Sequence, residues 1–135
     1  MAAAALGASP QKLILDLQTF GFVFETLSIR DLRAYTSATG GSLSYYRDRY
    51  GLESDCVLHL PDGRFALIEF KLGSRQIEEG ASHLLQIREL VRVANARNDG
   101  VRIDEPTFMM VVTGGGLAYT RKDGVHVVPI GCLKP

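Results

Sequence analysis

The sequence predicts one α/β domain in which helices cover both faces of a mixed β-sheet. Apolar residues recur at helical spacing near the beginning of the chain and again in its middle, and the segment between them alternates with a period of two. The expected order of elements is therefore helix, three strands, helix, strand and hairpin. A chain of 135 residues with 46% apolar content suits a single domain over residues 1–135 with its own core.

The first helical segment is predicted from a stripe of apolar residues spaced three and four apart. Ser9 is expected to cap its beginning, with Pro10 in the first helical position. Gly21 is a candidate break that would divide the segment into two helices, and Gly40-Gly41 is expected to end it. The stripe consists of Leu13, Leu17, Phe20, Phe24 and Leu27.

Three strands are predicted next, because residues 42–47, 53–60 and 64–72 alternate between apolar and polar positions. The second and third strands are joined by Pro61-Asp62-Gly63. This triplet suits a three-residue hairpin loop in which a type I turn is followed by glycine in the left-handed conformation.

The second half of the chain begins with a helix after Gly73 that is expected to reach about Arg97, because it carries one continuous apolar face. Residues 107–113 form an almost continuous apolar run, which predicts a strand that is covered on both faces. Residues 118–120 and 125–130 are expected to close the domain as a hairpin.

Composition excludes several classes of protein. Fifteen Lys and Arg balance 15 Asp and Glu, so there is no strongly basic surface, and any contact with DNA must be local. The longest apolar or small run, residues 1–8, is far shorter than the ~20 residues of a membrane span, and no charged segment precedes it as in a signal peptide. Cys56 and Cys132 are too few for a disulfide framework, which suits a reducing, cytoplasmic environment.

The candidate site follows from the register of the predicted hairpin. A three-residue loop places Asp55 directly across from Glu69 and Glu53 across from Lys71, so that two carboxylates and an amine share one face of the sheet. A slip of one residue in the loop would separate Asp55 from Glu69. The alternatives are a cross-strand ion pair between Lys71 and Glu53, and a solvated sheet face on which the acids are simply exposed.

Glu25 adds a third carboxylate, because it shares a helix face with Phe22 and Ile29. At about 5 Å and an effective dielectric of ~20, two carboxylates repel each other by roughly 3 kcal/mol. Lys71 offsets one of the three negative charges, and the remaining two are what Mg²⁺ or Mn²⁺ would neutralise. The alternatives are that Glu25 caps a neighbouring backbone or pairs with Arg47.

Asp55, followed fourteen positions later by Glu69-Phe70-Lys71, with an acidic helix before and a helix after, resembles the PD-(D/E)XK phosphodiesterase fold of Holliday-junction resolvases and many restriction enzymes. The resemblance implies a restriction-endonuclease-like mixed β-sheet flanked by helices. Ser54 stands where that superfamily has its nominal proline.

The same resemblance implies roles for four side chains in the hydrolysis of DNA phosphodiester bonds. Glu25, Asp55 and Glu69 would hold Mg²⁺ or Mn²⁺, which would activate the attacking water and neutralise charge on the phosphate. Lys71 would orient this water or help to deprotonate it.

Further runs of sequence resemble the C-terminal domain of unknown function of a large group of prokaryotic AAA-type ATPases. This resemblance implies that the chain is the C-terminal part of a longer protein and has an ATPase domain as its partner. The chain contains no G-x-x-x-x-G-K-[ST] motif, so no ATP hydrolysis is expected from this segment. The matching runs are Gly21-Phe22-Val23-Phe24-Glu25, Ile29-Arg30-Asp31-Leu32-Arg33, Tyr46-Arg47-Asp48 and residues 127–135.

Four polar residues are weaker candidates for contacts with DNA. Arg47, Arg49 and Arg75 lie near predicted strand ends, where they would contact phosphates without reading sequence, and ordinary surface charge is the alternative. Gln76, close after Lys71, is a candidate for the rim of the site.

His59, His83 and His126 fall on separate predicted elements, and their spacing matches neither a ligand pair nor a nucleophile-activating arrangement, so each is expected to be structural. The alternative to a nuclease is a catalytically inactive module with the same fold that docks a protein or a nucleic acid. The net charge of zero favours this alternative.

Overall fold

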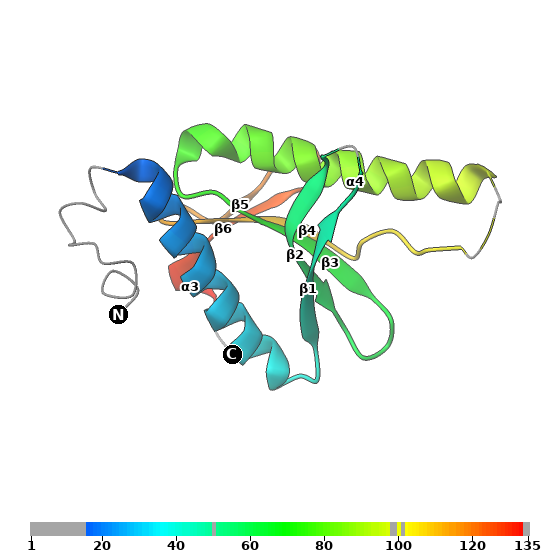
Figure 1. Cartoon of the computed structure of the whole chain (residues 1–135), viewed down its shortest axis with the longest axis horizontal. Helices are drawn as coiled ribbons and strands as arrows, with labels where there is room; N and C mark the ends of the chain where they lie inside the picture. Colours follow the sequence, from blue (N-terminus) through cyan, green and yellow to red (C-terminus); the bar gives the residue numbers. More distant parts are fainter. Residues whose placement is uncertain (1–15, 50, 98–99, 101, 134–135) are drawn as a thin grey trace.

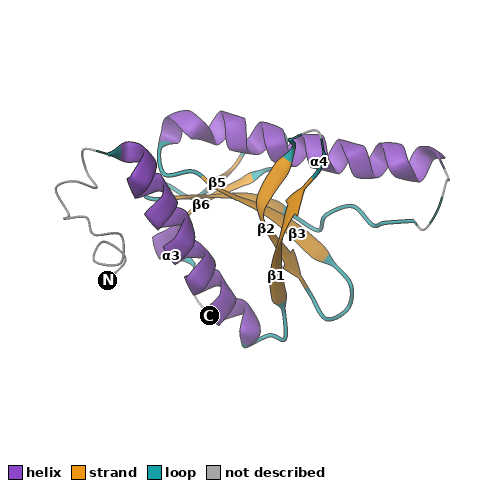
Figure 2. Cartoon of the chain, viewed as in Figure 1, coloured by secondary structure: helices purple, strands orange, loops and turns teal. Residues whose placement is uncertain are grey.

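The computed structural model describes residues 16–49, 51–97, 100 and 102–133, and within them two long helices flank a six-stranded mixed sheet (Figures 1 and 2). The predicted mixed α/β fold is therefore confirmed. The elements in chain order are α3 (Leu17–Ser37), β1 (Ser42–Arg47), β2 (Glu53–His59), β3 (Phe65–Phe70), η1 (Ser74–Gln76), α4 (Ile77–Arg97), β4 (Met109–Thr113), β5 (Tyr119–Thr120), β6 (His126–Pro129) and η2 (Ile130–Cys132).

Helix α3 begins at a side-chain cap. The Asp16 carboxylate accepts hydrogen bonds from the Thr19 main-chain N–H at 3.1 Å and from the Thr19 hydroxyl at 2.7 Å. The expected break at Gly21 is wrong, because α3 runs through this position without interruption. One glycine costs a helix only about 1 kcal/mol relative to alanine, which the packing of the remaining turns outweighs. The predicted cap at Ser9 and Pro10 lies outside the described residues.

Helix α3 ends three residues before Gly40, which has the left-handed φ of 77° that the sequence led us to expect at this end. The short connection leads directly into β1, so β1 and α3 are neighbours in sequence and in space.

The strand order across the sheet is β1-β2-β3-β4-β6-β5. Strands β1, β2 and β3 form an antiparallel meander. Strand β4 pairs in parallel with β3 on one side and with β6 on the other. Strand β5 pairs antiparallel with β6 at the edge of the sheet. Helix α4 makes the crossover between β3 and β4 that a parallel pair requires.

The hairpin between β2 and β3 has the predicted loop. The Leu60 N–H donates to the Arg64 carbonyl at 2.8 Å, and Gly63 adopts a φ of 90°. The observed pairs run from His59–Phe65 to Cys56–Ile68, so the predicted register is confirmed over this stretch.

Two apolar clusters lie on opposite faces of the sheet. Helix α4 packs Ala81 and Leu84 over Val57, Leu67 and the inward residues of β4 and β6. Helix α3 packs Leu32 against the other face, in a cluster that includes Cys56, Ile68, Phe70, Met110 and Val112. Figure 1 shows the two helices on different sides of the strands. Among the described helices, none combines the length and the apolar character that crossing a membrane requires.

Candidate active site

A β-bulge at Asp55 begins the site. Between successive paired positions of β1 and β2, β1 contributes the single residue Tyr45, whereas β2 contributes both Asp55 and Cys56. Such an extra residue bends its strand and changes the direction of the nearby side chains. The bulge was not predicted, because the alternation of apolar and polar residues over 53–60 is that of a regular strand.

The Asp55 carboxylate is held by the neighbouring strand. The Phe70 main-chain N–H donates to Asp55 Oδ2 at 2.9 Å. In a regular ladder this N–H would donate to a main-chain carbonyl, and the observed pairing of β2 with β3 ends at Cys56–Ile68. The Ser54 hydroxyl lies within 3.1 Å of both the Cys56 and the Ile68 carbonyl oxygens. Side-chain hydrogen bonds thus replace ladder bonds where the two strands separate.

Glu69 is buried next to Asp55, with 2% of its surface exposed. Its Oε1 atom has no hydrogen-bond partner, and its Oε2 atom lies 3.9 Å from Lys71 Nζ and 3.9 Å from His83 Nδ1. Burial, then the charge of Asp55, and to a smaller extent a hydrogen bond with the Asp55 side chain raise the pKa of the Glu69 carboxyl to about 8, against the opposite effect of Lys71. Without a further positive charge, this carboxyl is therefore largely protonated at neutral pH.

Lys71 follows β3 and is held at both its main chain and its side chain. Its N–H donates to the Val112 carbonyl at 2.9 Å, and only 18% of its side chain is exposed. A Cβ atom built on Gly80 of α4 would lie 3.1 Å from Lys71 Cγ. The absence of a side chain at Gly80 therefore lets the aliphatic stem of Lys71 pass over the helix.

Glu25 approaches the same end of the sheet from α3. Burial, and after it the charges of Asp55 and Glu53, raise the pKa of the Glu25 carboxyl above its ordinary value, whereas Lys71 acts in the opposite direction. The electrostatic influence of Asp55 on both Glu25 and Glu69 indicates that the three predicted acids occupy one region.

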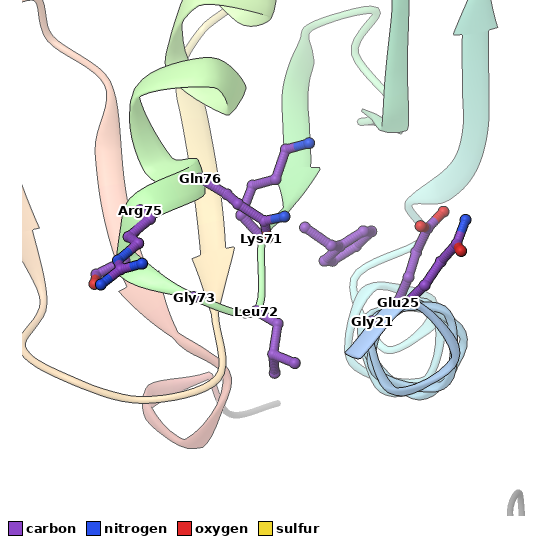
Figure 3. Close-up of a pocket in the computed structure, with 10 residues that line it drawn as sticks. Gly21, Glu25, Lys71, Leu72, Gly73, Arg75 and Gln76 are labelled. Carbon is purple, nitrogen blue, oxygen red and sulfur yellow. The ribbon is translucent and has the colours of Figure 1, made fainter. Parts of the chain in front are cut away.

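Two pockets meet at Glu25. One, of about 650 Å³, lies between α3 and the segment after β3, and Figure 3 shows Glu25 on one side of it and Lys71, Arg75 and Gln76 on the other. The second, of about 450 Å³, is lined by Glu25, Asp55 and residues at the adjoining ends of β1 and β2. Glu69 lines neither pocket, because it is buried.

The predicted arginines take different positions. Arg47 lines the second pocket and pairs with Glu53 across β1 and β2 at 3.0 Å. This pair contradicts the alternative that Glu53 is the partner of Lys71. Arg75 lies in η1 and lines the first pocket, whereas the exposed Arg49 lines neither pocket.

The acids do not form a closed metal centre in this arrangement. Within residues 16–133, excluding those that the structure does not describe, no three His, Cys, Asp or Glu side chains converge as metal ligands. The chemistry of the donors nevertheless fits a hard divalent ion, because carboxylate oxygens are its preferred ligands. The orphaned, buried Oε1 of Glu69 is the atom that such an ion would satisfy.

His83 lies at the site, beside Glu69, although the sequence analysis expected it to be structural. It lies in α4 three residues after Gly80 and four before Ile87, so that it shares the sheet-facing side of the helix with two buried residues. This helical spacing is the signal that could have found it.

The other predicted structural residues are accounted for locally. His59 Nε2 and the Ser44 hydroxyl are 2.7 Å apart, and His126 Nδ1 and the Thr120 hydroxyl are 2.8 Å apart. Cys56 is buried, and burial raises the pKa of its thiol to about 12, which makes it an unreactive apolar residue.

The sequence profile of a family described as a domain of unknown function (DUF4143) matches residues 20–133. No curated protein and no solved structure matches the chain. The matched range contains every residue of the candidate site.

Proposed function

The chain belongs to the DUF4143 family, a domain of unknown function, and from the geometry of its site we propose that it is a metal-dependent nuclease-like domain of the PD-(D/E)XK type. It hydrolyses DNA phosphodiester bonds with Mg²⁺ or Mn²⁺ and serves a prokaryotic AAA-type ATPase.

The observation that carries this proposal is the buried carboxylate of Glu69. Its Oε1 has no partner although the side chain is 2% exposed, and a second carboxylate, Asp55, lies beside it. An unpaired buried polar group is costly, so native proteins retain one mainly where it has a function. A divalent cation would remove this cost.

The order of elements and the placement of the acids also support it. A helix with Glu25 precedes the meander, Asp55 and Glu69 lie on adjacent antiparallel strands, and Lys71 follows two positions after Glu69. This is the order that the PD-(D/E)XK resemblance implies.

Each side chain then has a defined task. Glu25, Asp55 and Glu69 would hold the cation, which lowers the pKa of a bound water and offsets charge on the phosphate. Lys71, fixed by Gly80 and by the Val112 carbonyl, orients the water with its ammonium group.

The rim of the pockets supplies positive charge for the DNA backbone. Arg75 and Arg47 lie beside the two pockets that meet at Glu25, and both are exposed. Guanidinium groups at these positions contact phosphates and hold the strand in place without selecting a sequence.

The test is cleavage of supercoiled plasmid and of branched DNA with Mn²⁺ or Mg²⁺, comparing the wild-type chain with Glu69→Gln. Glu105→Gln is a matched control, because Glu105 is a half-exposed residue whose partner is Arg92. Loss of cleavage in Glu69→Gln alone supports the proposal. Equal cleavage by all three proteins removes the site.

A second candidate, a catalytically inactive docking module, is favoured by one observation. In the described part of the chain the acids do not close around a metal position. Calorimetry with Mn²⁺ separates the two functions, since a docking module shows no binding in the millimolar range, whereas the nuclease binds the ion.

A further inference from the structure

An imidazole that the proposed reaction does not use faces the buried carboxylate of Glu69. His83 Nδ1 lies 3.9 Å from Glu69 Oε2, and 32% of the His83 side chain is exposed. The ring therefore reaches the buried acid on one side and solvent on the other. Its position in α4 is fixed because the helix buries Gly80 and Ile87 against the sheet on either side of it in sequence.

His83 differs from the other two histidines in having no local hydroxyl partner. His59 is engaged by Ser44 and His126 by Thr120. Within the part of the chain that the structure describes, His83 makes its ion-pair contact with Glu69.

The separation of the two groups is too long for a direct hydrogen bond and is compatible with an ion between them. A nitrogen–oxygen distance of 3.9 Å exceeds hydrogen-bond length. When two ligand atoms each lie about 2.1 Å from one ion, they are roughly 3.0 Å apart if the angle at the ion is about 90°. They are roughly 4.2 Å apart if they lie on opposite sides of the ion. The observed distance lies between these two values, so a modest rotation of the two side chains would bring both groups onto one cation.

The surrounding charge is compatible with such an ion. Lys71 Nζ also lies 3.9 Å from Glu69 Oε2 and would repel a cation. Its single positive charge is opposed by the carboxylates of Glu25, Asp55 and Glu69, which leaves the site with an excess of negative charge when all three are ionised.

We propose that His83 is a further ligand of the cation held by Glu69, and that its imidazole makes the site prefer Mn²⁺ or another transition metal to Mg²⁺. The inference rests on the proposed metal site and assigns it a metal preference. Mg²⁺ binds oxygen ligands and retains its water, whereas imidazole nitrogen is a favourable ligand for transition metals.

The first experiment is calorimetric titration of the metal-free chain with Mn²⁺ and, separately, with Mg²⁺. His83→Asn is expected to weaken Mn²⁺ binding about tenfold or more and to leave Mg²⁺ binding nearly unchanged. His126→Asn, the matched control, is expected to retain the affinity of the wild type for both ions. Circular dichroism of each variant verifies the fold.

The outcomes separate the two proposals. Equal Mn²⁺ affinity of the wild type and His83→Asn overturns the role of His83 and leaves the metal site in place. Absence of Mn²⁺ binding by the wild type overturns the metal site and the role of His83 together.

A second measurement needs no folded variant. Pulsed electron paramagnetic resonance of Mn²⁺ bound to the wild-type chain detects the nitrogen of a coordinated imidazole. We expect this coupling in the wild type and its replacement by nitrogen-15 coupling when histidine is labelled. A spectrum without nitrogen coupling overturns the proposal.

Discussion

Lys71 and Gly80 are in such close contact that a Cβ atom on Gly80 would lie 3.1 Å from Lys71 Cγ and 3.5 Å from Lys71 Cε. The glycine belongs to α4 and the lysine follows β3, so the Lys71 side chain packs directly on the backbone of the helix. The position of the amine therefore depends on the absence of one methyl group.

Gly80→Ala is expected to displace the Lys71 amine. Alanine gains about 1 kcal/mol of helix propensity, and overpacking costs about 1–3 kcal/mol, so the free energy of unfolding is expected to be unchanged or to fall by up to about 2 kcal/mol. The rate of DNA cleavage is expected to fall by roughly tenfold to a hundredfold, because small displacements of a positioned group are costly. Urea denaturation and cleavage kinetics measure the two effects, and an unchanged rate would show that Gly80 does not set the position of Lys71.

Gly21→Ala is expected to stabilise the protein by about 0.5–1 kcal/mol, because Gly21 lies inside α3 and a Cβ atom there meets nothing within 4 Å. Thermal or urea denaturation measures the change. Destabilisation by this variant would mean that α3 is not a continuous helix at this position.

Glu69 gives the metal-free protein a specific dependence on pH. The folded state holds the proton of Glu69 up to about pH 8, whereas the unfolded state releases it near 4.5. The folded state therefore binds more protons between these values, so the contribution of Glu69 to stability is complete below about pH 4.5 and is lost as the pH rises towards 8.

Glu69→Gln is expected to reduce the fall in the free energy of unfolding between pH 4.5 and 8, because glutamine does not ionise. Above about pH 7 the variant is expected to be more stable than the wild type by roughly 1–3 kcal/mol, since it removes a buried charge. Urea denaturation in the presence of a chelator, at several pH values, measures the difference. Parallel pH profiles of the two proteins would contradict the shifted pKa of Glu69.

Two substitutions of Asp55 separate its structural task from its charge. Asp55→Ala leaves the Phe70 N–H without an acceptor and is expected to cost about 1–3 kcal/mol. Asp55→Asn keeps an acceptor oxygen, so its stability is expected to stay near that of the wild type, whereas Mn²⁺ binding and cleavage are lost. An Asp55→Asn variant with full Mn²⁺ affinity would exclude this carboxylate from the metal site.

Arg75→Ala is expected to weaken binding of DNA to the same extent for unrelated sequences and to lower the slope of log K against log salt by about 1. Fluorescence anisotropy at several salt concentrations measures both effects. Arg97→Ala, at the exposed far end of α4, is the matched control, and an equal effect of the two variants would place the DNA elsewhere.

Much of the fold was predictable because local chemistry decides it. The Pro61-Asp62-Gly63 loop sets the register of β2 and β3, and the observed pairs match it. The long apolar stripe of α4 fixes its bounds at Ile77–Arg97, and the unbroken apolar run of β4 reflects its burial on both faces.

Other features depend on contacts that a single sequence does not display. The bulge at Asp55 arises from the pairing of β2 with β1, and alternation along β2 alone cannot reveal it. Gly21 is tolerated in α3 because tertiary packing outweighs its propensity. His83 lies in α4 and Glu69 in β3, and the apolar pattern of each element says nothing about the other. Their contact follows from the packing of α4 against the sheet.

The candidate site draws its acids from both sides of the sheet, with Glu25 on α3 and Glu69 under α4. The two apolar clusters must therefore both be assembled before the acids can act together. Loosening α3 alone is therefore expected to withdraw the Glu25 carboxylate from the candidate site and to uncover the apolar face of the sheet that Leu32 covers.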